Sequence, residues 1–550
     1  MPLTRRASLT MLAAVLPAAS HALDAAPPAA PLFEGMGAHR VPDASRSPAA
    51  RRYAAQGFVL GWGFNGAEAA RSFAGALAHD PGCAAALWGR AWALGPSINA
   101  DMAAADAPAV EDAVQRARAL RDRAPPRWRD LIDALAARHP RPGSGQVDEQ
   151  AYERHLRSVA ARHPRDADVA VFAAEALMNL HPYDWWHADG RPQPWTAGIE
   201  RRLRHALALA PAHPGACHAW VHLMEGSPSP SRAAREAERL RTLVPGSGHL
   251  LHMPAHIDMR LGRYAAAVQA NEAALEADRR YLAQVDAQGA YRVGYVAHNH
   301  HFLWAAASMM GASARALAAA DAAYGAACGP SAPERGTRGA GTLQHFQALP
   351  LYARVRFGRW RELLTGMRPP DGDDAYPLAI WHYARGTAHL REGRPAEARG
   401  ELERLVGVAA RTDLATTRVK GVHEAAALVD IARLTLRSDL ELAEGRAAAA
   451  LADLQRAVAI EDALERDEPH LWLAPTRHAL GAAQLAAGQP AEAARTFEDD
   501  LRHYPRNAWS LAGLQRAQQQ LGRADAARAS GEAARVAWRD ADVPLPGPRA

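Results

Sequence analysis

A glycine-centred turn followed by an amphipathic stretch of helical period recurs along this chain and constrains its fold more than any other feature. Copies lie at 260–278, 391–405 and 486–501. The turn position is glycine in these three copies, at Gly262, Gly393 and Gly488, and Gly522 occupies the equivalent position further along the chain. A left-handed backbone conformation is easiest for glycine, so each turn is expected to end one helix and reverse the chain into the next. The recurrence predicts an all-α solenoid of helix pairs.

Length and composition favour the same architecture. A chain of 550 residues is too long for one compact core, which leaves several domains or an array whose units pack on their neighbours. Hydrophobic residues make up 49% of the chain and aromatic residues only 6%, which suits helices packed closely through alanine. In the helical stretch that begins at Arg51, Ala69 and Phe73 are expected to lock the second helix on the first. Asp80 and Pro81 then end that helix.

Four segments are expected along the chain. Residues 1–22 are predicted to be a secretory signal peptide with Arg5 and Arg6 before the apolar stretch, exported by the general or the twin-arginine route. Residues 23–48 form an Ala/Pro-rich tether. Residues 49–330 hold the N-terminal helical repeats with a histidine-rich groove, and residues 331–550 hold the C-terminal repeats. The mature protein is expected to be periplasmic or secreted.

Charge and hydropathy exclude two function classes. The net charge of +5 is spread over the chain with acidic and basic residues mixed, and Lys420 is the single lysine. Nucleic-acid binding requires basic residues gathered on one face, so no nucleic-acid partner is expected. Beyond the signal segment no stretch is apolar for the roughly 18 residues that a membrane helix needs, so no membrane insertion is expected.

The chain resembles a family of exported bacterial tetratricopeptide-repeat proteins. The resemblance rests on four strings: Q-G-F-V-L-G-W-G-F-N, L-W-G-R-A-W-A-L-G-P-S-I-N, H-M-P-A-H-I-D-M-R-L-G-R-Y and H-N-H-H-F-L-W. It covers nearly the whole mature chain and implies a tetratricopeptide-like, right-handed helical-repeat solenoid. No established activity of the family accompanies it, so the resemblance implies a fold and no function.

Histidines repeat at the period of the helix pairs. His218, His222 and Glu225 fall at i, i+4 and i+7, on one helical face. His252 lies 34 residues after His218, and His256 lies 34 after His222, the length of one tetratricopeptide repeat. The third helix carries His298 and His301 on one face. Because first helices of such repeats line the concave surface, six histidines are predicted to project into one groove: His218, His222, His252, His256, His298 and His301.

This pattern predicts a metal site. Neutral imidazole suits zinc and iron, and two histidines one helical turn apart can present two ligands to one ion. Glu225 would add a ligand or a general base. The other interpretation is a set of packing or hydrogen-bonded histidines. Pro254 complicates the register, because a helix starting at Met253 would leave His249 and His252 in a loop.

Other residues are predicted to contact a ligand in the groove: Tyr183, Trp186, His249 and His382. Asn65 and Asn99 end family-like strings and are expected to cap turns. Three functions remain open at this point. The first is a scaffold that binds a peptide, protein or small ligand; the second is a zinc- or iron-dependent hydrolase or oxidase; the third is metal storage or delivery. The sequence decides neither whether the protein is an enzyme nor its oligomeric state.

Overall fold

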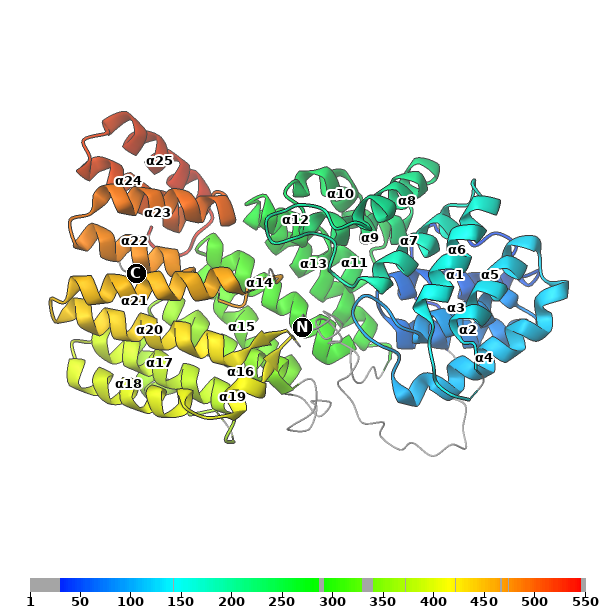
Figure 1. Ribbon diagram of the computed structural model, residues 1–550, viewed down its shortest axis with the longest axis horizontal. Coiled ribbons are helices and arrows are strands. Elements are labelled where there is room, and N and C mark those ends of the chain that lie inside the picture. Colours follow the sequence, from blue (N-terminus) through cyan, green and yellow to red (C-terminus); the bar gives the residue numbers. More distant parts are fainter. Residues whose placement is uncertain are drawn as a thin grey trace. The chain divides into compact units, whose positions relative to one another are not determined.

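The computed structural model describes residues 30–141, 143–285, 291–328, 340–370, 372–420, 422–464, 467–472 and 474–545. The predicted signal peptide and the first part of the predicted tether, up to residue 29, lie outside this range. Within the described residues the chain forms 25 α-helices and one short antiparallel hairpin (Figure 1). The all-α prediction is therefore confirmed.

The chain divides into two compact units. The first contains the described residues up to Ile257 together with Glu272–Tyr291, and the second contains Asp258–Asn271 and the residues from Arg292 onward. This division falls earlier in the chain than the boundary after residue 330 expected from sequence. The division also falls inside two helices, each of which contributes residues to both units.

The first unit consists of short helices joined by tight turns. Its α-helices are α1 (Pro48–Trp62), α2 (Gly66–His79), α3 (Ala84–Leu94), α4 (Ala107–Leu120), α5 (Pro126–Arg138), α6 (Glu149–Arg162), α7 (Ala167–Leu180), α8 (Thr196–Leu209), α9 (Pro214–Glu225), α10 (Ala234–Leu243) and α11 (Gly248–His252). Its 3-10 turns are η2 (Ala104–Asp106), η3 (Arg121–Arg123) and η4 (Pro230–Ala233). The two helices shared with the second unit are α12 (Pro254–Arg260) and α13 (Tyr264–Leu282).

The second unit contains longer helices and the hairpin. Its α-helices are α14 (Ala297–Met309), α15 (Ser313–Ala327), α16 (Ala340–Arg356), α17 (Ala375–Arg391), α18 (Pro395–Ala409), α19 (Asp413–Thr416), α20 (Ala425–Ala443), α21 (Ala447–Ala463), α22 (Thr476–Ala486), α23 (Pro490–His503), α24 (Ala508–Gln520) and α25 (Ala524–Ala537). Two π-helical turns are η5 (Tyr291–Val296) and η6 (Glu362–Gly366). Strand β1 (Arg418–Val419) pairs with β2 (His423–Glu424), with Val419 opposite His423.

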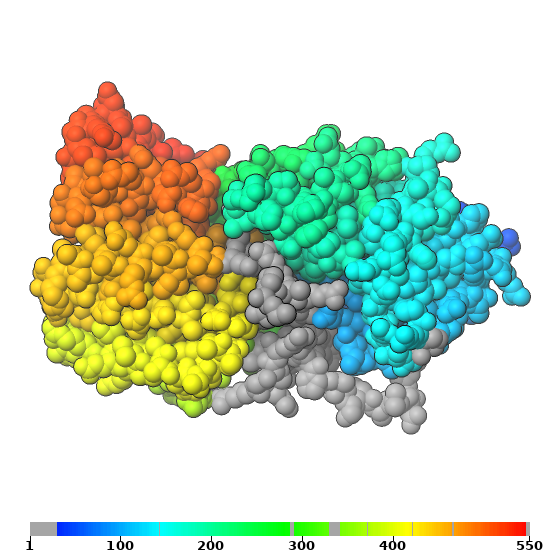
Figure 2. All heavy atoms as spheres, viewed as in Figure 1, coloured from blue at the N-terminus to red at the C-terminus, as the bar shows by residue number. Residues whose placement is uncertain are grey.

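Consecutive helices of the second unit pack on one another. Each helix from α20 to α25 contacts the next along the chain (Figure 1). In the space-filling view their atoms follow one another from yellow to red as a continuous stack (Figure 2). Neighbour-on-neighbour packing is the property that defines a helical-repeat array.

One packing device occurs in both units. The Phe73 ring lies so close to Gly57 and Gly89 that a Cβ at either glycine would stand 2.7 Å and 2.4 Å from it. Phe497 fills the same place between Gly481 and Gly513, where the distances would be 2.5 Å and 2.3 Å. Each glycine lies sixteen residues from its phenylalanine. The aromatic lock predicted for Phe73 is thus present, and the facing residues must be glycine because no larger residue fits.

The predicted glycine turns are also confirmed. The backbone φ angles of Gly262, Gly393, Gly488 and Gly522 are +65°, +72°, +71° and +71°. Residues with a Cβ rarely adopt this left-handed region, so the four glycines fix the position of each turn. Among the described residues, no helix has the length and apolar run needed to cross a bilayer.

Candidate metal centre

Helix α9 carries the first part of the candidate site and is fixed at its start. The His213 imidazole accepts a hydrogen bond from the Ala216 N–H at 3.2 Å, and Pro214 occupies the first turn, where its missing N–H costs nothing. A Cβ at Gly215 would stand 2.6 Å from the Trp62 ring, so the glycine lets α9 pack directly on α1. Every residue of α9 is buried.

The second part of the site lies where the next helix is interrupted. Ser247 caps α11, which ends at His252, and α12 begins at Pro254. Proline cannot donate the helical hydrogen bond, so the interruption falls at Met253. A new helix starts at Pro254, as the sequence suggested. His249 and His252 nevertheless lie on α11 and not in a loop.

These helices bring five imidazole rings together with Glu225; we call the group formed by His218, His222, His249, His252, His256 and Glu225 the histidine cluster. The Nε2 atoms of His218 and His249 are 3.1 Å apart, and those of His252 and His256 are 2.9 Å apart. One ligand atom each from His218, His222 and His249 lies within 4.8 Å of the others.

The histidine of the next helix whose Nε2 contacts His218 Nε2 is therefore His249, 31 positions later. It is not His252, which lies at the repeat period of 34. His249 was predicted as a groove contact, and the structure places it on α11 beside His218. The five rings are 0 to 4% exposed, so they do not line an open channel.

Glu225 connects the two halves of the histidine cluster. Its Oε1 lies 2.9 Å from His222 Nδ1, and its Oε2 forms an ion pair with His256 Nδ1. A carboxylate that accepts from Nδ1 fixes the tautomer and leaves the lone pair on Nε2. His222 Nε2 is buried without a hydrogen-bond partner. The His218 ring is oriented by a hydrogen bond to the backbone of Trp62.

Burial sets the charge state of these groups. Burial, followed by the charge of His222, holds the pKa of His218 well below its ordinary value of 6.5. Burial and the neighbouring His218 do the same to the pKa of His249. Burial alone would raise the pKa of Glu225, but His256 and His222 together hold it below its ordinary value of 4.5. Burial therefore favours neutral imidazoles at His218 and His249, near the ionised carboxylate of Glu225.

Two aromatic residues in unusual backbone conformations form a wall of the histidine cluster. Phe64 has a φ of +56°, and its ring lies 4.5 Å from that of His218 and 5.2 Å from that of His249, measured between centroids. Tyr183 has a φ of +55°, its ring lies 5.8 Å from that of His222, and its hydroxyl donates to Asn99 Oδ1. Such conformations cost about 1–3 kcal/mol each and gather at functional sites.

A second group of potential ligands lies in the same unit. His39, Asp168 and His213 also bring one ligand atom each within 4.8 Å of the others. His213 Nε2 lies 2.9 Å from Asp168 Oδ1, and the Arg127 guanidinium binds the second carboxylate oxygen. Arg127 also pairs with Asp166 at 3.0 Å. We call this group the arginine-braced cluster.

The remaining predicted histidines lie in the second unit. His298 packs its ring 4.9 Å from that of Phe302 on α14. His301 is fully buried, and its Nε2 lies 3.4 Å from His345 Nε2. The Nδ1 of His345 in turn contacts the Tyr376 hydroxyl at 2.9 Å. The structure therefore places His301 in a histidine pair of its own.

The other predicted contacts have separate surroundings. His382 Nδ1 lies 2.7 Å from Glu401 Oε2, in an ion-pair network with Arg385 on the second unit. Trp186 donates its indole N–H to Leu223 O at 2.7 Å, which ties the 183–192 loop to α9. Asn65 caps α2, as predicted, whereas the oxygen of Asn99 receives the Tyr183 hydroxyl.

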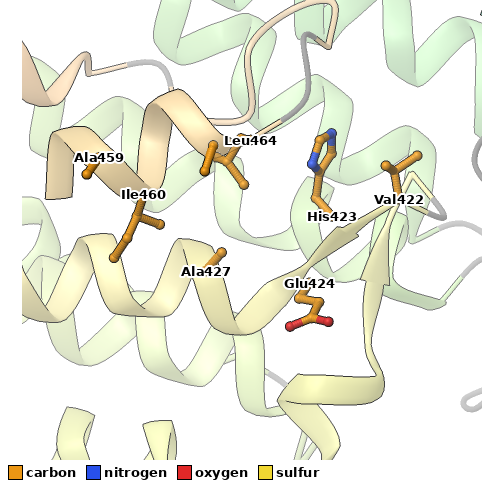
Figure 3. Close-up of a pocket in the computed structure, with 8 residues that line it drawn as sticks. Val422, His423, Glu424, Ala427, Ala459, Ile460 and Leu464 are labelled. Carbon is orange, nitrogen blue, oxygen red and sulfur yellow. The ribbon is translucent and has the colours of Figure 1, made fainter. Parts of the chain in front are cut away.

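A shallow pocket of about 450 Å³ lies beside the hairpin of the second unit (Figure 3). Its lining combines residues of the hairpin and of helices α20 and α21: Val422, His423, Glu424, Ala427, Ala459, Ile460, Ala463 and Leu464. Only two of these side chains are polar. The lining suits an apolar group better than a metal ion.

No family model and no curated protein sequence matches this chain. Its fold is similar to several solved structures. The human IFIT1 dimer with m7Gppp-AAAA is 12% identical, over 89% of this chain and 90% of that one, with a TM-score of 0.31. The P58(IPK) TPR domain is 13% identical over 88% and 92%, with a TM-score of 0.20. The APC/C Cut9–Hcn1 hetero-tetramer is 10% identical over 90% and 95%, with a TM-score of 0.29.

The class of protein follows from the helix pairs themselves. The repeated aromatic lock, the left-handed glycine turns and the neighbour-on-neighbour packing define an all-α helical-repeat protein of the tetratricopeptide type.

Sequence reasoning missed Phe64 and gave His249 a different role. Nothing in the residue type marks Phe64, because a left-handed aromatic residue has no sequence signature; its place in the string G-W-G-F-N was the only available signal. For His249, the spacing of seven residues from His256 was visible, but its contact with His218 across two helices was not.

Proposed function

We propose that this protein is an exported helical-repeat scaffold that binds a transition-metal ion through His218, His222 and His249. The observation that carries the proposal is the approach of His218 Nε2 to His249 Nε2, 3.1 Å apart on different helices, with a His222 ligand atom within 4.8 Å of both. Two nitrogens bound to one tetrahedral zinc lie about 3.3 Å apart, close to the observed separation.

The donor set favours zinc over iron. Non-haem iron sites usually take two histidines and one carboxylate as direct ligands. Here the carboxylate of Glu225 faces the Nδ1 atoms of His222 and His256, the position of an outer partner that orients a ligand. Three imidazole ligands without a direct carboxylate suit zinc, and they leave one tetrahedral position for water or another small donor.

Metal-dependent hydrolysis or oxidation is the second candidate function. It is favoured by the three-histidine set, because a zinc ion with one exchangeable position can activate water. Glu225 then acts as a positioning residue and not as the general base, since both of its oxygens face imidazole nitrogens. Burial of the rings limits any substrate at the ion to a small molecule. A peptide or protein partner would bind elsewhere on the scaffold.

The first test is the metal content of protein purified without a histidine tag, compared with a His218→Gln/His249→Gln variant. The matched control is His301→Gln/His345→Gln, which alters another buried pair whose Nε2 atoms are 3.4 Å apart. We expect near-stoichiometric zinc in the wild type and the control, and loss of the ion bound by these histidines in the first variant. Folding is checked by circular dichroism. Wild-type protein that holds no metal after incubation with zinc contradicts the proposal.

Export is tested separately. The proposed route to the periplasm or medium rests on the charged and apolar pattern of residues 1–22. We expect the mature protein to start near Leu23, as measured by mass spectrometry of protein recovered from the periplasm. Replacement of Arg5 and Arg6 by lysine blocks export only if the twin-arginine route is used.

A further inference from the structure

We infer that the histidine cluster holds a second metal ion on His252 and His256, and that Glu225 is shared between the two ions as their common outer carboxylate. This inference rests on the proposed function, because it adds a second ion beside the first. The cluster offers an N–N pair at each position, 3.1 Å apart in one and 2.9 Å in the other.

The number of donors is the first argument. A four-coordinate zinc site accepts at most four protein ligands, and a site with an exchangeable position accepts three. Five buried imidazoles exceed both numbers. They divide by geometry into the set His218, His222 and His249 and the pair His252 and His256. The excess is explained if the pair serves an ion of its own.

The orientation of the rings is the second argument. Glu225 Oε1 accepts from His222 Nδ1, and Glu225 Oε2 accepts from His256 Nδ1. Both rings are thereby held with Nε2 as the ligand atom, and the Nε2 of His256 faces that of His252. A carboxylate that orients a single ligand needs only one of its oxygens. Glu225 contacts a ring with each of its two oxygens, which indicates that it orients two metal ligands, His222 and His256.

The helix interruption supplies the third argument. His252 is the last residue of α11, and His256 lies in the first turns of α12. Their separation of four residues would normally stack them along one continuous helix. Although the helix is interrupted at Met253, their Nε2 atoms still lie 2.9 Å apart, with exposed fractions of 0% and 4%. Such a pair forms either one N–H···N hydrogen bond or two bonds to one ion.

His252 and His256 supply two of the second ion's ligands, and further donors complete its coordination. Two dications beside a single carboxylate carry excess positive charge in a buried place, which is costly unless anions accompany them. We therefore expect hydroxide or a small oxyanion to complete the coordination. The two sets are adjacent, since the ring centroids of His222 and His256 are 5.6 Å apart and those of His249 and His252 are 5.8 Å apart.

Zinc titration followed by native mass spectrometry tests the inference. The proteins are the wild type, His252→Gln/His256→Gln, Glu225→Gln and the control His301→Gln/His345→Gln. We expect two ions per chain in the wild type and the control, and one in the His252→Gln/His256→Gln variant. Glu225→Gln is expected to weaken both binding steps, by about 10–100-fold each, because both sites lose their outer carboxylate.

The outcomes separate the two proposals. One ion in the wild type, kept in the His252→Gln/His256→Gln variant, overturns the second ion and leaves the first intact. No ion in the wild type overturns both. If that double variant fails to fold, the wild-type stoichiometry decides alone: two ions lost on competition with a chelator support the inference, and one ion contradicts it. A Glu225→Gln change that affects only one binding step contradicts the shared role of the carboxylate.

Discussion

The first unit contains two buried groups of potential ligands with the same crowding and different chemistry. In both the histidine cluster and the arginine-braced cluster, three ligand atoms lie within 4.8 Å of one another. In the arginine-braced cluster the carboxylate of Asp168 lies inside the group and already binds the Arg127 guanidinium. In the histidine cluster the carboxylate of Glu225 lies behind the imidazoles, which face one another.

The difference shows that crowding alone does not define a metal site. Both nitrogens of His213 have partners, the Ala216 N–H and the Asp168 carboxylate, so the ring caps α9 and has no lone pair to offer. His222 has one nitrogen on Glu225, and its buried Nε2 lacks a hydrogen-bond partner. A fixed arginine also repels a cation, and the histidine cluster contains no arginine. The arginine-braced cluster therefore positions the helix that the histidine cluster uses.

The largest effect is expected from removal of the arginine. Arg127→Met leaves the Asp168 carboxylate buried without its main cation, and breaking a buried ion pair costs about 3–5 kcal/mol. Urea unfolding of the metal-free protein measures the loss. The zinc bound per folded chain should stay unchanged, because Arg127 binds Asp166 and Asp168 and not the residues of the histidine cluster. Loss of zinc with little loss of stability would reverse the roles assigned to the two clusters.

The second largest effect is stabilisation by zinc. A ligand that binds only the folded chain stabilises it by about 2.7 kcal/mol when its free concentration is one hundred times Kd. We expect the unfolding midpoint of the wild type to rise with zinc and to fall again with a chelator. His39→Gln, in the arginine-braced cluster, should respond as the wild type does, while His218→Gln/His249→Gln should lose most of the response. An equal response in all three proteins would indicate zinc binding elsewhere.

Sequence alone was sufficient for the fold where a packing rule has a sequence signature. The turns at Gly262 and Gly393 were predicted because glycine adopts the left-handed conformation most easily. The lock at Phe73 was predicted from the pairing of a small residue, Ala69, with an aromatic one, whereas the glycines that face the ring were not predicted. The candidate site was predicted in part: α9 carries His218, His222 and Glu225 on one helix as the spacing implied. Periodicity gives the face of a helix, and this was enough for α9.

The rest of the candidate site depends on tertiary contacts that the helical periodicity of the sequence does not predict. His249 contacts His218, although the register of 34 had paired His218 with His252. His301 bonds to His345, whose position 44 residues later carries no repeat signal. The arginine-braced cluster joins residues from four separate segments. Such contacts are set by tertiary packing, and a single sequence shows only which residues are available.

The third effect is a pH dependence of the metal-free protein. Burial holds the folded-state pKa values of His218 and His249 well below 6.5, so the unfolded chain takes up protons first as the pH falls. The stability from these neutral rings is fully present above pH 6.5 and is lost as the pH falls below it, by up to about 1.4 kcal/mol per histidine and pH unit. Unfolding of the wild type and of His218→Gln/His249→Gln, compared from pH 7 to 5, measures the difference.

In that comparison the variant should show the shallower dependence, because it lacks the two groups. The arginine-braced cluster also contributes to the pH dependence, because burial lowers the pKa of His39 to about 4 despite the opposing charge of Asp168. This contribution is equal in the two proteins, because the variant leaves that cluster unchanged. Identical slopes would mean that His218 and His249 titrate normally and are accessible to water, which would contradict the enclosed cluster.

The smallest effect concerns the wall that Phe64 and Tyr183 form at the histidine cluster. Tyr183→Phe keeps the ring beside His222 and removes the hydroxyl that bonds Asn99, so we expect a loss of about 0.5–1.5 kcal/mol in the free energy of unfolding. Tyr152→Phe in the same unit is the control, because its buried hydroxyl has no hydrogen-bond partner and its removal should cost nothing. If the Tyr183 hydroxyl holds the left-handed loop against the cluster, its loss should also speed the release of zinc to a chelator, and an unchanged release rate would limit the wall to a packing role.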